Sequence, residues 1–239
     1  MMGYNLEMKN ILRAVSLPMW ILMLVSSVLF VIFPGVDLYV SGLFYNVQND
    51  FYLNNSLFEH FFYFSVKPVL FGLLAGAIIV WLYNYFTKKT VLRFTGKKLI
   101  FILLVAGIGS GLIVNEMFKE HWGRARPGQV IEFGGDKIFT PAFIMSDQGG
   151  YSFSCGHGSG AFTLIAVALL FYRHRKVAMG VALSYGALVS LARIVGGGHF
   201  LSDTVTSFYV MWIVSHMLYY VMFERASKAN NNETADRLV

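Results

Sequence analysis

Charged residues and cysteine are scarce in this sequence. Asp, Glu, Lys and Arg make up 13% of its 239 residues, where soluble domains average about 25%. The single cysteine, Cys155, excludes an intrachain disulfide and leaves the redox compartment open. Because 56% of the residues are hydrophobic and the mean hydropathy is +0.58, the composition argues against a soluble protein and indicates an integral membrane protein.

No internal repeat is evident, and the length fits one domain covering residues 1–239. A cleaved signal peptide is the alternative for the first apolar segment, but Pro34-Gly35 follows it instead of a small-residue cleavage site, which favours a retained helix. The polar tail, about 226–239, is expected to be disordered. The pattern predicts an all-α bundle of six transmembrane helices at about 17–33, 61–86, 99–118, 158–172, 177–195 and 200–223.

Lys and Arg residues are distributed unevenly between the connections, which predicts an orientation. Thirteen lie at the N-terminus, in the 87–98 and 173–176 connections and in the tail, and six lie on the opposite side or at helix ends. By the positive-inside rule, both termini are expected in the cytoplasm. The net charge of +6 is therefore explained mostly by the orientation in the membrane, and nucleic-acid binding loses its main support.

Three short polar clusters interrupt the apolar pattern, and the same count places all of them on the non-cytoplasmic face. They are residues 119–127, 154–157 and 193–203. Together they supply three cations, two histidines and a carboxylate. Such a set can hold a phosphate and break its ester bond, with an anionic membrane lipid as the substrate class.

Lys119, Arg126 and Arg193 are the candidate phosphate clamp, although each alone would be read as an interfacial anchor. Guanidinium forks match phosphate oxygens, and three cations can neutralise the charge that develops during phosphoryl transfer. Arg124 is expected to make a contact at the rim. Lys67 is interpreted as an interfacial anchor, with the mouth of the active site as the alternative.

His199 and Asp203 are the candidate catalytic pair. A helix starting near His199 would place the Asp203 carboxylate beside the imidazole, fixing its tautomer and stabilising its positive form. This suits a nucleophile that forms a phosphohistidine. Asp203 could equally cap the helix, and the two roles are compatible. His157 can protonate the departing alkoxide and then activate water.

Two further features concern the anion and metals. Gly156 and Gly158 allow backbone N–H groups to face an anion at a helix start. A zinc site built from His157, His199 and Asp203 is disfavoured, because the three neighbouring cations would repel a divalent ion. No metal and no cofactor are therefore expected.

The clusters resemble the type 2 phosphatidic acid phosphatase superfamily, whose pattern is K-x6-R-P, then P-S-G-H, then S-R-x5-H-x3-D. The resemblance implies a phosphatase without a metal, with His199 as nucleophile, Asp203 as its partner and His157 as general acid. The positions that match with the spacing kept are Lys119, Arg126-Pro127, Gly156-His157, Arg193, His199 and Asp203.

Two positions depart from the family pattern. Ser154-Cys155 stands in place of Pro-Ser, and Ala192 replaces the serine before Arg193. The family serine hydrogen-bonds a phosphate oxygen, and a thiol is the weaker donor. Cys155 and the Gly156 N–H are assigned to that contact, with Ser154 as a substitute and slow turnover as a possible consequence.

Residues 110–205 further resemble the bacterial lipid A 4′-phosphatase branch of this superfamily, through Asn115, residues 121–124 and residues 135–139 with Pro141. This implies removal of a phosphate from lipid A at the periplasmic face of the inner membrane. A lipid A 1-phosphatase, a phosphatidylglycerophosphate phosphatase or an undecaprenyl-diphosphate phosphatase would need the same clamp. A transporter or a silent binding protein is the non-enzyme alternative, disfavoured because the charges lie at helix ends. The oligomeric state is left open.

Overall fold

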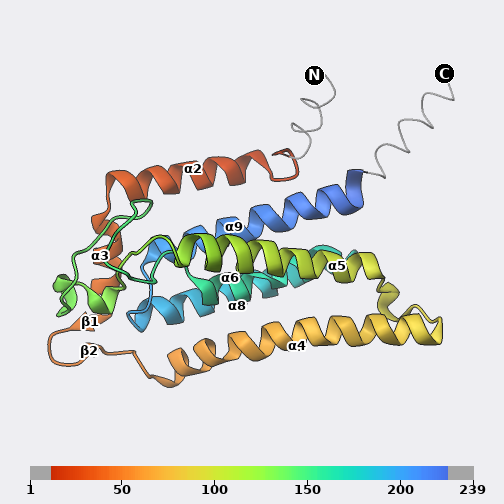
Figure 1. Ribbon diagram of the computed structural model, residues 1–239, viewed down its shortest axis with the longest axis horizontal. Helices are drawn as coiled ribbons and strands as arrows, with labels where there is room; N and C mark the ends of the chain where they lie inside the picture. Colours follow the sequence, from red (N-terminus) through yellow and green to blue (C-terminus); the bar gives the residue numbers. More distant parts are fainter. Residues whose placement is uncertain (1–11, 226–239) are drawn as a thin grey trace, which may run out of the picture.

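The computed structural model describes residues 12–225, which form a bundle of helices running along one long axis (Figure 1). The predicted disorder of the tail lies outside the described residues. The helices are α2 (Leu17–Ile32), α3 (Gly35–Gly42), α4 (Leu57–Thr87), α5 (Gly96–Leu104), α6 (Gly156–Phe162), α7 (Leu164–Leu170), α8 (Arg175–Val195) and α9 (Leu201–Tyr219). Two of them continue as π-helix, α5 into η2 (Val105–Lys119) and α9 into η5 (Tyr220–Glu224).

Short elements fill the connections. Strands β1 (Tyr45–Asn46) and β2 (Asp50–Phe51) pair antiparallel in a small hairpin between α3 and α4. Single 3₁₀ turns occur at η1 (Val91–Arg93), η3 (Pro127–Gln129) and η4 (Ile131–Phe133).

Four helices are long and apolar enough to cross a membrane: α4, Gly96–Lys119, α8 and Leu201–Glu224. A fifth candidate is the pair α2 and α3, which is bent by 89°. The segment predicted at 158–172 belongs to a shorter apolar helix, Gly156–Leu170. At about 1.5 Å per residue it falls short of a hydrocarbon core about 30 Å thick. The chain is thus a mostly helical, multi-pass membrane protein with four or five candidate spans, and the count of six stays a prediction.

Helix α4 begins earlier than the sequence suggested and is not broken by proline. The Ser56 side chain caps it by accepting a hydrogen bond from the Glu59 N–H, 3.2 Å away. The helix then continues through Pro68 to Thr87. Its first turns therefore extend beyond the predicted span of 61–86 and reach the end of the bundle where the hairpin lies (Figure 1).

Apolar side chains from α4, α5, α7 and α9 form the main core, centred on Phe101, Ile165 and Met211. Large side chains pack directly against glycines of neighbouring helices, which small residues commonly allow between membrane helices. A Cβ on Gly109 would lie 2.8 Å from the Met211 sulfur, and one on Gly186 would meet the Phe162 ring. This packing fixes where the ends of α8 and α9 lie.

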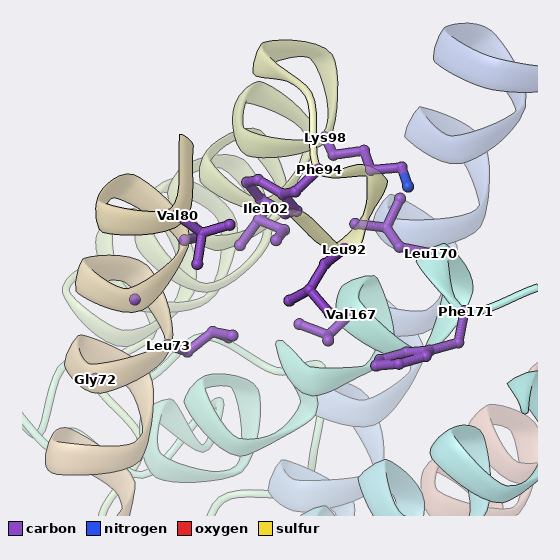
Figure 2. A pocket seen from close by; sticks show the side chains of 12 residues that line it. Gly72, Leu73, Val80, Leu92, Phe94, Lys98, Ile102, Val167, Leu170 and Phe171 are labelled. Carbon is purple, nitrogen blue, oxygen red and sulfur yellow. The ribbon is translucent and has the colours of Figure 1, made fainter. Parts of the chain in front are cut away.

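The two ends of the bundle differ in charge and polarity. The start of α9 carries Asp203, while near its other end Lys97 lies over the Phe223 ring and Arg175 over the Tyr219 ring, at 5.2 and 4.9 Å. The basic 87–98 and 173–176 connections therefore lie opposite the polar clusters. Near the basic end, α4, α5 and α7 enclose an apolar hollow of about 360 Å³ whose single cation is Lys98 (Figure 2).

Candidate active site

The three polar clusters meet at one end of the bundle, as predicted, because several elements end or begin there. Lys119 is the last residue of η2, Arg126 precedes η3, and Arg193 lies in the last turn of α8. His157 is in the first turn of α6, and His199 and Asp203 lie at the start of α9.

His199 is buried, with 1% of its surface exposed, and its orientation is fixed by the backbone. Its Nδ1 lies 2.6 Å from the Ser152 carbonyl oxygen and 3.6 Å from Asp203 Oδ2. A carbonyl only accepts, so Nδ1 carries the hydrogen and Nε2 keeps its lone pair. The tautomer predicted to be fixed by Asp203 is thus fixed first by Ser152, with the carboxylate behind it.

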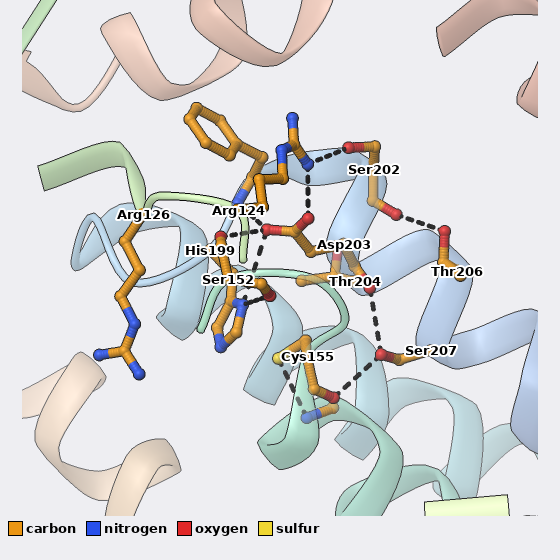
Figure 3. Close-up of polar contacts among 12 residues, drawn as sticks. Arg124, Arg126, Ser152, Cys155, His199, Ser202, Asp203, Thr204, Thr206 and Ser207 are labelled. Atoms are coloured by element: carbon orange, nitrogen blue, oxygen red, sulfur yellow. Dashed lines mark hydrogen bonds and ion pairs between the residues drawn. The ribbon is translucent and has the colours of Figure 1, made fainter. Parts of the chain in front are cut away.

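Asp203 caps α9 and its carboxylate lies 3.6 Å from the His199 ring, while its role in catalysis stays a prediction. Its Oδ2 accepts hydrogen bonds from Ser152 Oγ at 2.6 Å and from the Phe200 N–H at 2.8 Å, so it caps α9. The same oxygen faces the His199 ring, and Figure 3 shows the ring, Ser152 and the carboxylate side by side. Burial lowers the pKa of His199, but the charges of Cys155 and Asp203 outweigh it and raise the pKa above its usual value.

Arg124 is not a rim contact, and that expectation is wrong. Its side chain is fully buried and it makes ion pairs with Asp37 of α3 and Asp203 of α9. Its nitrogens donate to Thr140 O (2.8 Å), Ser202 Oγ (2.9 Å), Asp203 Oδ1 (2.5 Å) and Asp37 Oδ2 (2.7 Å). We call Arg124, Asp37, Ser202 and Asp203 the Arg124 cluster.

Asp37 was missed by the sequence analysis. It is buried and also accepts hydrogen bonds from the Ser202 N–H at 2.9 Å and the Ser202 hydroxyl at 2.5 Å. A carboxylate in an otherwise apolar stretch just after Pro34-Gly35 was the available signal, but its partners lie far along the chain. The cluster therefore ties α3, the segment after η2 and the start of α9 together.

Arg193 is held against two residues of α4. Its Nη1 lies 3.1 Å from Glu59 Oε1, and its guanidinium lies 4.6 Å from the centre of the Tyr63 ring. Its Nε is buried and has no hydrogen-bond partner among residues 12–225. Gly198 allows this placement, because a Cβ there would lie 2.1 Å from Nη2. A buried donor without an acceptor is costly, so this nitrogen is suited to a bound oxyanion.

Lys119 and Arg126 are close enough to Arg193 for their positive charges to act on one another. Burial and the charge of Arg193 lower the pKa of Arg126. In the described part of the chain, neither Lys119 nor Arg126 forms an ion pair with a carboxylate, and Figure 3 shows Arg126 extending away from the Arg124 cluster. We call Lys119, Arg126 and Arg193 the cation cluster. With Glu59 as its one carboxylate partner, it keeps positive charge that suits a phosphate.

The His157 ring stacks on Tyr63, with centroids 4.4 Å apart and planes inclined by 25°. Tyr63 thus contacts both His157 and Arg193, and sequence reasoning missed it. The signal available was its spacing: Glu59, Tyr63 and Lys67 recur every four residues and share one face of α4. Lys67 lies on the same face of α4, and its two interpretations, an interfacial anchor or a residue at the mouth of the active site, both stay predictions.

Cys155 caps α6, and its Sγ accepts a hydrogen bond from the Gly158 N–H at 3.3 Å. This amide is therefore not available to an anion, contrary to expectation. Gly156 packs closely on Asn115, whose Oδ1 would lie 2.5 Å from an added Cβ. Burial raises the pKa of the Cys155 thiol, but His199 and Arg193 outweigh it, so the pKa is lowered. The Ser154 hydroxyl is buried and finds no partner within residues 12–225.

The residues weighed as zinc ligands do not form a metal-binding group. Among residues 12–225, no set of three or more His, Cys, Asp or Glu side chains is arranged to hold a metal ion. The expectation that no metal is needed stays a prediction.

Comparison with known proteins gives a consistent result. The model of the PAP2 superfamily matches residues 98–227. A lipid A 4′-phosphatase of Francisella tularensis subsp. novicida is 36% identical over 205 residues, covering 83% of this chain and 91% of the relative. Proteins of the same name from Rhizobium leguminosarum and Rhizobium etli are 25% and 27% identical, covering 85% of this chain and 93% and 84% of their own lengths. No solved structure matches the chain.

Proposed function

Because the chain belongs to the PAP2 superfamily, we propose that it removes the 4′-phosphate of lipid A. It is a membrane lipid phosphatase by family. The observation that carries the choice of substrate is the 36% identity to the Francisella lipid A 4′-phosphatase, which extends over 83% of this chain. The open cation cluster beside a buried histidine supports the same reaction class.

The chemistry would proceed in two steps through His199. Its Nε2 attacks phosphorus while the bond to the sugar oxygen breaks, and His157 protonates that oxygen as it leaves. Water, deprotonated by His157, then attacks the phosphohistidine and releases inorganic phosphate. The cation cluster stabilises charge on the phosphoryl oxygens in both steps. Asp203 and Ser152 hold the ring and favour its positive form.

The proposed placement is a six-span, single-domain protein of the inner membrane with its site facing the periplasm and both termini in the cytoplasm. The bent pair α2 and α3 and the helix Gly156–Leu170 would supply the two spans beyond the four long ones. The polar clusters lie at one end of the bundle and the basic connections at the other, which is what the positive-inside rule requires of this orientation. A lipid substrate in the same membrane would reach the site laterally.

The alternative phosphatases differ from this proposal in their substrate and not in the residues that would bind the phosphate. A lipid A 1-phosphatase, a phosphatidylglycerophosphate phosphatase and an undecaprenyl-diphosphate phosphatase would all use three cations and two histidines. A transporter would place its charges near the middle of its helices, and here they lie at one end. The names of the three relatives favour the 4′ position.

The test is mass spectrometry of lipid A incubated with the purified protein and with His199→Ala. We expect the wild type to remove one phosphate, which fragmentation assigns to the 4′ position, and His199→Ala to leave lipid A unchanged. Added chelator should not lower the rate. Loss of the 1-phosphate instead would make the protein a lipid A 1-phosphatase. If lipid A stays unchanged while phosphatidylglycerophosphate or undecaprenyl diphosphate is hydrolysed, the hydrolysed lipid is the substrate and lipid A is not.

A further inference from the structure

A second feature lies beside the cation cluster: a hollow of about 420 Å³ between the β1–β2 hairpin, the first turns of α4, η3 and the turn at 196–198. Arg126, Arg193 and Tyr63 form part of its wall, so it opens directly onto the candidate phosphate site. Its volume lies within the range of small-molecule sites. The group that carries a phosphate bound at Arg126 and Arg193 can extend into this space.

The remaining wall is polar, unlike the apolar hollow at the other end of the bundle (Figure 2). The side chains of Asp50, Asn54 and Asn55 are exposed and make no hydrogen bond to any part of the chain within residues 12–225. Gln129 accepts a hydrogen bond from the Arg126 N–H through Oε1 at 3.0 Å, which leaves its NH₂ group for a ligand. These groups offer several donors and acceptors to one bound molecule.

An aromatic surface completes the wall. Phe64 is 59% exposed, and the centre of its ring lies 4.8 Å from that of the His60 ring. Sugars present hydroxyl and amide groups at their edges and C–H groups on their faces. Amide and carboxylate side chains beside an exposed aromatic ring fit both surfaces of such a molecule.

We infer that this hollow is a saccharide subsite that binds the amide- and hydroxyl-bearing sugar ring whose phosphate occupies the cation cluster. The inference rests on the proposed function. A glycerophospholipid or a polyprenyl phosphate would bring an aliphatic chain or few hydroxyls and would gain little from the exposed amides of Asn54 and Asn55. A diphosphate would bring a second anion toward the carboxylates of Asp50 and Glu59, which repel it.

The experiment compares the full-length double variant Asn54→Ala/Asn55→Ala with the wild type on lipid A and on p-nitrophenyl phosphate. We expect KM for lipid A to rise about tenfold or more, since two hydrogen bonds are lost, while turnover of the small ester stays the same. Asn49→Ala is the matched control: it is the same residue type, is exposed in the turn between β1 and β2 and does not line the hollow. It should leave both substrates unaffected.

Each other outcome decides a separate question. Unchanged lipid A kinetics in the double variant would overturn the saccharide subsite while leaving the proposed function intact, and equal losses on both substrates would also overturn it. If the wild type fails on lipid A, the proposed function falls, and N-acetylglucosamine 4-phosphate is then used as an inhibitor of p-nitrophenyl phosphate hydrolysis. Weaker inhibition of the double variant than of the wild type keeps the subsite, and equal inhibition rejects it.

Discussion

Arg124 and Arg193 lie at the same end of the bundle but in opposite electrostatic surroundings. Arg124 faces two carboxylates, and each of its guanidinium nitrogens donates a hydrogen bond. Arg193 faces one carboxylate, shares its surroundings with Arg126 and Lys119, and keeps a buried Nε without a partner among residues 12–225. The first cluster is complete without a ligand. The second keeps a buried donor that a bound anion would satisfy.

The difference separates a structural task from a chemical one. A buried ion pair adds little stability over an apolar packing, but removing one partner leaves an uncompensated charge at a cost of about 3–5 kcal/mol. The Arg124 cluster is in that position because Asp37 and Asp203 are both buried. In the cation cluster, Lys119 and Arg126 have no carboxylate partner among the described residues and are repelled by their neighbours, so loss of either should cost the fold little and phosphate binding much.

His199 connects the two clusters, so changing it should have the largest effect on activity. His199→Ala removes the proposed nucleophile and should lower turnover by at least about 10⁴-fold while the protein still inserts and folds. Asp203→Asn keeps the size of the side chain and should lower turnover less, because the Ser152 carbonyl still fixes the ring. Phosphate release from lipid A measures both. Appreciable activity in His199→Ala would remove it as nucleophile, and an equal loss in Asp203→Asn would mean that its charge acts directly.

The contrast between the arginines is tested by one substitution at two places. Arg124→Met leaves Asp37 and Asp203 buried without a counter-ion, so stability in detergent should fall by about 3–5 kcal/mol and activity should fall with it. Arg126→Met should leave the unfolding temperature within a degree or two. It should lower kcat/KM by about 10²–10³-fold, as for loss of one group that stabilises transition-state charge.

Thermal unfolding followed by fluorescence and phosphate release from lipid A give the two readouts. A variant with Arg124→Met that unfolds like the wild type would show that the cluster is not needed for the fold. An Arg126→Met protein that is destabilised as much as Arg124→Met would erase the distinction between the clusters.

Sequence spacing anticipated the parts of this site that are local. The interval from Arg193 to Asp203 placed His199 beside its carboxylate, because a helix begins between them. It could not reveal the partners of Arg124 or Arg193. Asp37 lies 87 residues from Arg124, and Glu59 lies 134 residues from Arg193. Such pairs depend on how the helices pack, which periodicity along one segment does not contain.

The fold prediction was limited in a similar way, because hydropathy locates apolar segments but not the bends and ends of the helices that they form. The six predicted apolar segments lie largely in helix. The first segment turns by 89° into α3, which brings Asp37 under Arg124. The fourth is shorter than a full span and presents His157 and Cys155 at its start. The departures from the predicted architecture thus occur where the site is built.

Tyr63 offers a smaller test of how the cation cluster is positioned. Its ring contacts both Arg193 and His157, so Tyr63→Leu should lower kcat about tenfold with little change in KM, because the general acid loses its support. Tyr63→Phe keeps the ring and should stay within about threefold of the wild type. If Tyr63→Phe is as slow as Tyr63→Leu, the hydroxyl acts on the substrate and the ring is not the reason.

Cys155 should give the smallest effect, and its direction tests how the thiol is used. It caps α6 through its sulfur, and serine is a better cap and a better hydrogen-bond donor. Cys155→Ser should therefore keep or raise turnover of lipid A, by no more than about threefold, with unchanged or slightly higher stability. The lowered pKa of the thiol beside His199 gives the competing outcome. If the sulfur carries negative charge that stabilises the positive charge of the phosphohistidine ring, Cys155→Ser loses activity, and the gap in activity between the two proteins widens as the pH rises through the pKa of the thiol.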